Sequence, residues 1–128
     1  MSKSGWIGVD LDGTLAHYAV FKGVDHIGLP VPKMAVKVRQ MLADGEDVRI
    51  FTARVDGGAV ALQAGDNQGK HFENVERVTE IIQDWTEFHF GVRLPVTNKK
   101  DYGMIELYDD RAIQIIPNTG VRADGKPL

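Results

Sequence analysis

The sequence predicts an α/β protein: one domain, residues 1–128, built on a parallel β-sheet. Short apolar runs rich in strand-forming residues alternate with longer segments in which apolar residues recur at helical spacing. A strand, helix, strand order with short connections favours parallel strands joined by right-handed crossovers. Acidic residues follow two of the apolar runs, where strands are expected to end, and open α/β sheets bind ligands at the carboxyl ends of their strands.

Composition narrows the class of protein. Hydrophobic residues make up 43% of the chain and charged residues 26%, as in an ordinary globular domain. The net charge of -3 gives no broad basic surface for duplex nucleic acid, and the lack of cysteine rules out disulfides, thiol nucleophiles and cysteine-ligated metals. The sequence shows no secretory signal and no apolar run of the ~20 residues that a membrane span needs. We therefore expect a cytoplasmic protein without a membrane partner.

The first apolar run, residues 6–9, leads into Asp10 and Asp12. At a strand end, residues two apart project to the same side, so the two carboxylates are expected to lie close together. Close carboxylates repel each other, and their hard oxygen ligands favour Mg²⁺. Gly13 then permits a sharp turn, and a solvated acidic turn is the alternative interpretation. An EF-hand is excluded, because with Asp10 as the first loop position its invariant glycine would be Leu15 and its final glutamate would be Phe21.

Residues 13–33 are rich in glycine and proline and predict a flap above this strand end, with a small hairpin at residues 17–21. A proline in the first turn and a glycine after the last favour a helix over residues 32–45. The next apolar run, residues 48–54, predicts a strand with the hydroxyl of Thr52 at its carboxyl edge. Thr52 is thereby expected beside the acidic pair, although threonine is also ordinary in a strand.

The second half of the chain continues the alternation. The glycine-rich residues 55–70 are predicted to form a mobile loop, and residues 71–90 carry the apolar stripe of a core helix. Short strands are predicted over residues 94–97 and 104–108. The remaining predictions are a strand over residues 112–116 and a loosely held tail over residues 117–128.

Four motifs carry a resemblance to a known family. Asp10-Leu11-Asp12-Gly13-Thr14 resembles the first motif of the haloacid dehalogenase-like (HAD) hydrolases, which are mostly Mg²⁺-dependent phosphatases. Phe51-Thr52-Ala53-Arg54, Asn98-Lys99-Lys100-Asp101 and Asp109-Asp110-Arg111 match the family's second, third and fourth motifs in order. A response-regulator receiver uses similar residues, but its phosphoacceptor aspartate ends a middle strand, where this chain has Thr52. The resemblance implies a three-layer Rossmann-like sheet of the HAD type.

The resemblance also implies roles for single residues. Asp10 would attack phosphorus to form an aspartyl-phosphate, and Asp12 would protonate the leaving oxygen and then activate water. Thr52 and Lys100 would bind phosphoryl oxygens together with backbone amides of the turn from Leu11 to Gly13. Lys99 remains an alternative to Lys100, because both follow the predicted third strand. Arg54 is a candidate for the substrate anion, with a surface ion pair as the alternative.

The cofactor implied by the resemblance is Mg²⁺. It would be held by Asp10, the backbone carbonyl of Asp12, and the carboxylates of Asp109 and Asp110. Arg111 either orients the last two carboxylates or forms a surface ion pair.

The intervals between the motifs already hold the predicted helices and leave no room for the cap domain of larger family members. The expected protein is therefore a minimal, capless phosphomonoesterase that resembles small members of the superfamily, some found in phage genomes. An open site suits a nucleotide, a nucleic-acid end or another large phosphorylated substrate. Alternatively, a neighbouring subunit covers the site. Nucleic acid is expected only as a substrate, and oligomerisation stays open. The alternatives are a non-catalytic phosphate- or metal-binding module of the same fold, and an unrelated α/β fold with coincidental acidic turns.

Overall fold

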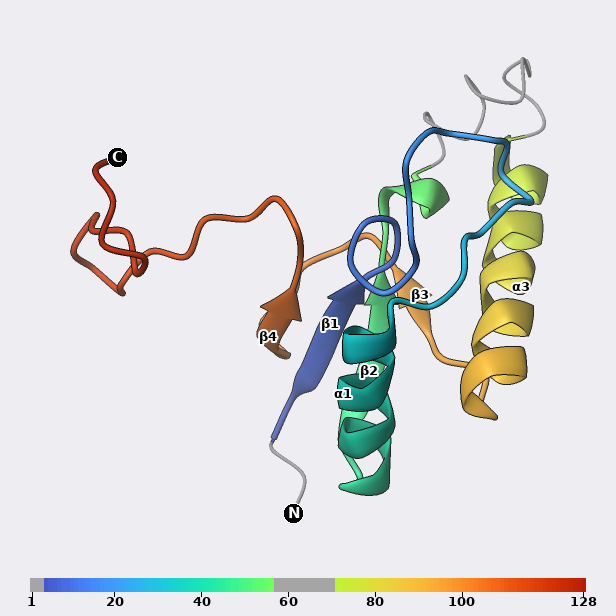
Figure 1. Ribbon diagram of the computed structural model, residues 1–128, viewed down its shortest axis with the longest axis horizontal. Coiled ribbons are helices and arrows are strands. Elements are labelled where there is room, and N and C mark those ends of the chain that lie inside the picture. Colours follow the sequence, from blue (N-terminus) through green and yellow to red (C-terminus); the bar gives the residue numbers. More distant parts are fainter. Residues whose placement is uncertain (1–3, 57–70) are drawn as a thin grey trace.

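The computed structural model describes residues 4–56 and 71–128 and shows an α/β fold with a 4-stranded, all-parallel sheet (Figure 1). The strand order is β3-β2-β1-β4, and these strands are Val96–Thr97, Asp47–Phe51, Trp6–Asp10 and Met104–Tyr108. Helix α1 (Pro32–Ala43) connects β1 to β2, and helix α3 (His71–Phe90) precedes β3. The predicted α/β class and parallel sheet are confirmed.

The hydrophobic core lies between the sheet and the two helices. The chain steps from β1 to β2 and on to β3 in one direction, and right-handed crossovers then place both helices on the same face. Ile7 and Val9 of β1 point to this face and belong to one buried cluster with Val38 of α1 and Ile82 of α3. This packing fixes β1 in the middle of the sheet, and the residues that follow β1 therefore lie at the centre of its carboxyl edge.

The opposite face of the sheet carries no helix within the described residues, so the third layer expected there is not found. The chain returns from β3 to β4 through residues 98–103, which are too few for a crossover helix of about a dozen residues. On this face the Trp6 side chain is 2% exposed, and the Arg49 guanidinium lies 4.8 Å from its ring centroid. The Trp6 indole donates a hydrogen bond of 2.8 Å to Asp101, which covers its edge.

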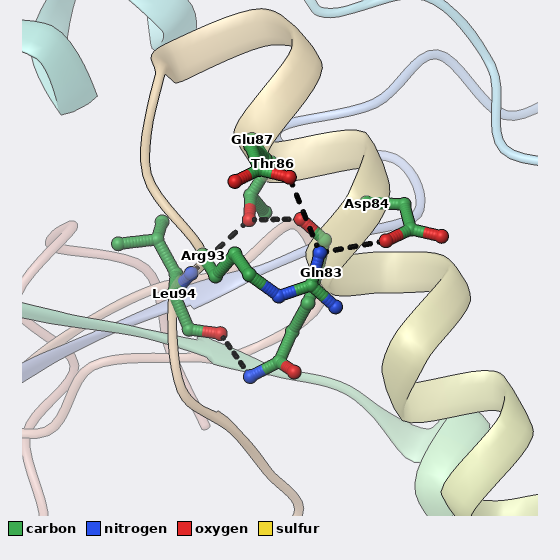
Figure 2. A network of polar contacts seen from close by, with 6 residues as sticks. All are labelled: Gln83, Asp84, Thr86, Glu87, Arg93 and Leu94. Atoms are coloured by element: carbon green, nitrogen blue, oxygen red, sulfur yellow. Dashed lines mark hydrogen bonds and ion pairs between the residues drawn. The ribbon is translucent and has the colours of Figure 1, made fainter.

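A polar network joins the end of α3 to the segment that enters β3 (Figure 2). The buried hydroxyl of Thr86 accepts a hydrogen bond of 3.1 Å from the Leu94 amide, and Gln83 donates one of 3.0 Å to the Leu94 carbonyl oxygen. These bonds satisfy both backbone groups of a residue that is only 3% exposed. They hold β3 against β2, where the Thr52 amide donates to the Thr97 carbonyl oxygen at 2.9 Å.

Two strand predictions are wrong. Residues 112–116 form no strand, because Asp109 accepts hydrogen bonds from the amides of Arg111 and Ala112 and the chain turns away from the sheet after β4. This segment makes one isolated bridge, between Ile115 and Arg122, within the tail that leads away from the body in Figure 1.

The predicted hairpin at residues 17–21 is also absent, because Ala16 pairs with Pro30 at the base of the flap and leaves residues 18–29 as a loop. The strand predicted over residues 48–54 ends at Phe51, and Ala53–Val55 forms a short 3-10 helix, η1. Of the predicted mobile loop, residues 57–70 lie outside the described part of the chain.

Candidate functional site

The candidate site lies at the carboxyl edge of the sheet, where β1, β2 and β4 end side by side. Asp10 is the last residue of β1, Thr52 follows β2, and Asp109 and Asp110 follow β4. Parallel pairing brings these strand ends together although the residues are far apart in sequence. The flap lies above the same edge in Figure 1.

The turn after β1 is fixed by its own backbone and by two buried leucines. Leu11 and Leu15 are both 0% exposed and anchor the turn in the core. Gly13 has φ +88°, and a Cβ atom there would lie 2.6 Å from an Asp110 carboxylate oxygen, so this position requires glycine. The Leu11 carbonyl oxygen accepts hydrogen bonds from the amides of Thr14, Leu15 and Ala16.

Three carboxylates gather beside this turn. Asp10, Asp109 and Asp110 each offer an oxygen atom within 4.8 Å of the others. The Asp109 side chain is held by hydrogen bonds of 2.9 and 2.8 Å from the Arg111 and Ala112 amides. The cluster therefore presents several hard oxygen ligands on one side, the donor set that suits Mg²⁺.

The electrostatics of Asp10 agree with a cation site. Burial raises its pKa from 3.8 to about 7, helped by a hydrogen bond with Asp110 and by the negative charges of Asp109 and Asp110. The Thr14 hydroxyl donates a hydrogen bond of 3.1 Å to Asp10 and opposes the rise. A divalent cation between these groups would offset their repulsion and favour the ionised form of Asp10. The donor set and its surplus of negative charge thus fit Mg²⁺.

Asp12 points away from the acidic cluster and toward Arg54. The two side chains form a bidentate ion pair, with Nε to Oδ2 at 2.7 Å and Nη2 to Oδ1 at 2.9 Å. Side-chain exposure is 8% for Arg54 and 21% for Asp12, so water screens this pair less than an exposed one. The sequence predicts that Arg54 binds a substrate anion or forms a surface ion pair. In this structure its partner is a carboxylate within the site, and the pair is largely buried.

Thr52 is 3% exposed, and its hydroxyl oxygen accepts a hydrogen bond of 3.1 Å from the Arg54 amide. This bond caps η1 and leaves the hydroxyl hydrogen to act as a donor. The Gly13 amide, in contrast, donates to the Ala16 carbonyl oxygen at 2.9 Å. This bond uses the Gly13 amide within the turn.

A cavity of about 380 Å³ joins the acidic cluster to the Asp12–Arg54 pair. Its polar end contains these side chains and Thr52, and its apolar wall comes partly from the flap. The cavity is lined by Asp10, Asp12, Tyr18, Phe21, Val24, Phe51, Thr52, Ala53, Arg54, Asp109, Asp110 and Arg111.

The structure does not bring Lys99 or Lys100 into this group. Both are exposed and neither lines the cavity. Asp101 is bonded to Trp6, the first residue of β1, so the chain has already reached the amino end of the sheet one residue after Lys100. Arg111 is the additional cation that lines the cavity, and its place directly after the acidic pair was the signal in the sequence.

Sequence reasoning predicted a flap above this strand end but missed the residues that the flap contributes to the site. The aromatic side chains of Tyr18 and Phe21 line the cavity, and the carbonyl oxygens of Val24 and His26 accept hydrogen bonds from Arg54. Backbone acceptors leave no pattern in a sequence, and the aromatic residues of the flap follow no helical or strand period.

Comparison with protein-family models, with curated proteins and with solved structures found no match. Among the described elements, neither α1 nor α3 has both the length and the apolar character needed to cross a bilayer.

Proposed function

We propose that this chain is a small phosphohydrolase of the HAD type that uses Mg²⁺ to hydrolyse a phosphate monoester. The observation that carries the proposal is the convergence of Asp10, Asp109 and Asp110 at one strand edge, beside Asp12 and Thr52 in a single cavity. The nucleophile, the acid/base and a hydroxyl donor are thereby within reach of one bound phosphate.

The proposed reaction has two steps. An Asp10 carboxylate oxygen attacks phosphorus and the bond from phosphorus to the ester oxygen breaks. Asp12, which enters this step in its protonated form, gives its proton to the ester oxygen and is left as a carboxylate. Water then attacks the aspartyl-phosphate, Asp12 takes a proton from the water, and phosphate leaves with Asp10 restored. Thr52 donates its hydroxyl hydrogen to a phosphoryl oxygen.

The metal site has a defined role in this proposal. Asp10, Asp109 and Asp110 would hold Mg²⁺, which supplies the positive charge that lets a carboxylate approach an anionic phosphate. The protein's own contribution is to fix two of these ligands. Thr14 donates to Asp10, and the backbone amides of Arg111 and Ala112 orient Asp109.

The lining and the volume of the cavity indicate which substrates would fit. Its polar end suits the phosphate, and Tyr18, Phe21, Val24 and Phe51 form an apolar wall for the body of the ester. A volume of about 380 Å³ suits a small organic phosphate or the terminal nucleotide of a longer strand.

The test is hydrolysis of p-nitrophenyl phosphate with Mg²⁺, with EDTA, and with the variant Asp10→Asn. The control is Asp44→Asn, which removes an exposed carboxylate at the end of α1. A panel of nucleotides and phosphorylated DNA ends follows, because the surrogate lacks the body of a natural substrate.

We expect Mg²⁺-dependent turnover that Asp10→Asn abolishes and Asp44→Asn leaves unchanged. Turnover that survives Asp10→Asn, or Mg²⁺ and phosphate binding without turnover across the whole panel, contradicts the proposal. The second result identifies a non-catalytic module.

A further inference from the structure

One guanidinium group joins the acid/base residue to the flap. Arg54 holds both carboxylate oxygens of Asp12, and the same group donates to the Val24 carbonyl oxygen at 3.1 Å and to the His26 carbonyl oxygen at 2.8 Å. All three guanidinium nitrogens are thus used, two of them on the flap. Because the guanidinium is planar and rigid, these partners fix its position from two sides.

The flap is anchored at its base independently of Arg54. The His17 amide donates to the Leu29 carbonyl oxygen at 2.8 Å, and the Val31 amide donates to the Leu15 carbonyl oxygen at 2.7 Å. The Gly28 backbone packs closely against this base: a Cβ atom at this position would lie 2.0 Å from the His17 carbonyl oxygen. The base therefore stays in place when the rest of the loop moves.

The tip of the flap, residues 18–27, is held by Arg54 and by Val24 and Ile27, which pack against the hydrophobic core. Within the tip the structure shows one backbone hydrogen bond, from the His26 amide to the Gly23 carbonyl oxygen at 3.3 Å. The two bonds from Arg54 are charge-assisted, and the Arg54 side chain is 8% exposed, so they are the stronger ones. The tip also carries Tyr18, Phe21 and Val24 over the cavity, so its position decides whether the apolar wall exists.

We propose that Arg54 is a positioning residue that couples closure of the flap tip to the orientation of Asp12. With the tip down, its two carbonyl oxygens hold the guanidinium, and the guanidinium holds Asp12 facing the cavity. With the tip up, Arg54 loses two of its partners and Asp12 loses its fixed orientation. The acid/base geometry and the wall of the cavity are therefore assembled together. The inference has a structural half, the coupling of Arg54 and Asp12 to the flap tip, and a catalytic half, the effect of that coupling on Asp12 as acid/base. Only the catalytic half rests on the function proposed above.

The structural half is tested by hydrogen exchange, read by mass spectrometry on peptides from the flap tip and from α1. The variants are Arg54→Gln, Asp12→Ala and the double variant. The control is Arg93→Gln, which removes a surface arginine that is paired with Asp84 and Glu87. We expect each single variant to raise flap exchange about tenfold or more, the size that follows from losing a charge-assisted hydrogen bond.

The double variant decides whether the two residues act as one unit. We expect it to exchange no faster than Arg54→Gln alone, because Asp12 acts on the flap only through Arg54. Unchanged exchange of the α1 peptide shows that each variant is folded. Wild-type flap exchange in Asp12→Ala, or additive effects in the double variant, overturns the coupling.

The catalytic half is tested by comparing two esters in Arg54→Gln and Arg54→Lys. We expect kcat for an alkyl phosphate, whose leaving group needs a proton, to fall about tenfold or more, and kcat for p-nitrophenyl phosphate to change much less. We also expect KM to rise for the ester with the larger apolar body. Lysine should not rescue either value, because it lacks the planar fork.

Direct phosphate binding by Arg54 predicts different results. KM would then rise equally for all esters, lysine would restore it in part, and the flap would exchange as in the wild-type protein. Those results overturn the inference. Absence of turnover in the wild-type protein contradicts the proposed function instead, and the exchange experiment still decides the coupling.

Discussion

Asp10 and Asp110 present carboxyl oxygens within 4.8 Å of each other, although one residue ends β1 and the other follows β4. Two carboxylates this close repel each other when both are ionised, and this proximity helps burial to raise the pKa of Asp10. This repulsion destabilises the folded, metal-free protein near neutral pH.

The first prediction concerns that instability. The pKa of Asp10 is about 7 in the folded protein against 3.8 as the ordinary value, so between pH 4 and 7 the folded state holds a proton that the unfolded state has lost. The contribution of Asp10 to the free energy of unfolding therefore falls as pH rises through this window, and it is level above the window. We expect Asp10→Asn to raise Tm in EDTA, increasingly from pH 4.5 to 7.5, and Mg²⁺ to raise the wild-type Tm at pH 7.5. Asp44→Asn serves as the control. The prediction is refuted if the Tm of the wild-type protein rises relative to the Tm of Asp10→Asn as the pH increases.

The second prediction concerns Asp12. Replacing its carboxyl group in Asp12→Asn removes the proton donor, so the effect should grow as the leaving group becomes poorer. We expect kcat for an alkyl phosphate to fall by about 10²-fold or more, the usual size of general acid catalysis, and kcat for p-nitrophenyl phosphate to fall much less. Steady-state kinetics on a series of esters with graded leaving groups measures this. Equal losses along the series would assign Asp12 another role.

The third prediction separates backbone strain from a clash at the metal site. Gly13 and Gly45 both have positive φ, at +88° and +78°, but a Cβ atom at Gly45 meets nothing within 4 Å. Gly45→Ala should therefore cost only the strain, about 1 kcal/mol. Gly13→Ala should cost more and should also weaken Mg²⁺ binding, because the new methyl group displaces Asp110. Urea unfolding and calorimetric titration with Mg²⁺ check both variants, and equal Mg²⁺ affinity in the two would be evidence against the metal site described here.

The fourth prediction concerns the network that places β3. Thr86 is 0% exposed, and its hydroxyl serves the Leu94 amide and the Gln83 carbonyl oxygen. Thr86→Val leaves the amide buried without an acceptor and should lower the free energy of unfolding by about 1–3 kcal/mol. Thr79→Val is the matched control, because among the described residues that hydroxyl bonds back to Val75 within α3. Chemical denaturation of both variants gives the difference, and similar losses would show that the network adds nothing to β3.

The fifth prediction compares the candidate phosphate-binding cations. Arg111 lines the cavity, and Lys99 and Lys100 do not. We expect Arg111→Gln to raise KM for p-nitrophenyl phosphate several-fold, as loss of a charge-assisted contact implies, and Lys100→Gln and Lys99→Gln to leave it near the wild-type value. The opposite ranking would mean that the side chain of Lys99 or Lys100 turns into the cavity when substrate binds.

Much of the fold followed from local patterns. The helical stripe over residues 71–90 and the apolar runs at β1 and β4 predict their elements because apolar spacing reflects the face that each element buries. The strand predicted at residues 112–116, in contrast, is absent from the structure. A strand needs a partner, and the turn held by Asp109 leads the chain away from the edge strand β4, so residues 112–116 do not pair with it.

The sequence by itself determined that acidic residues follow the ends of two strands and that a threonine follows a third, because strand ends are marked locally by where an apolar run stops. Only the tertiary structure decided which of these side chains meet. It placed Asp10 with Asp109 and Asp110, turned Asp12 toward Arg54 and the flap, and left Lys100 near the amino end of the sheet. The physical reason is that strand order and backbone acceptors depend on packing between distant segments, and neither is encoded in the spacing of residues along the chain.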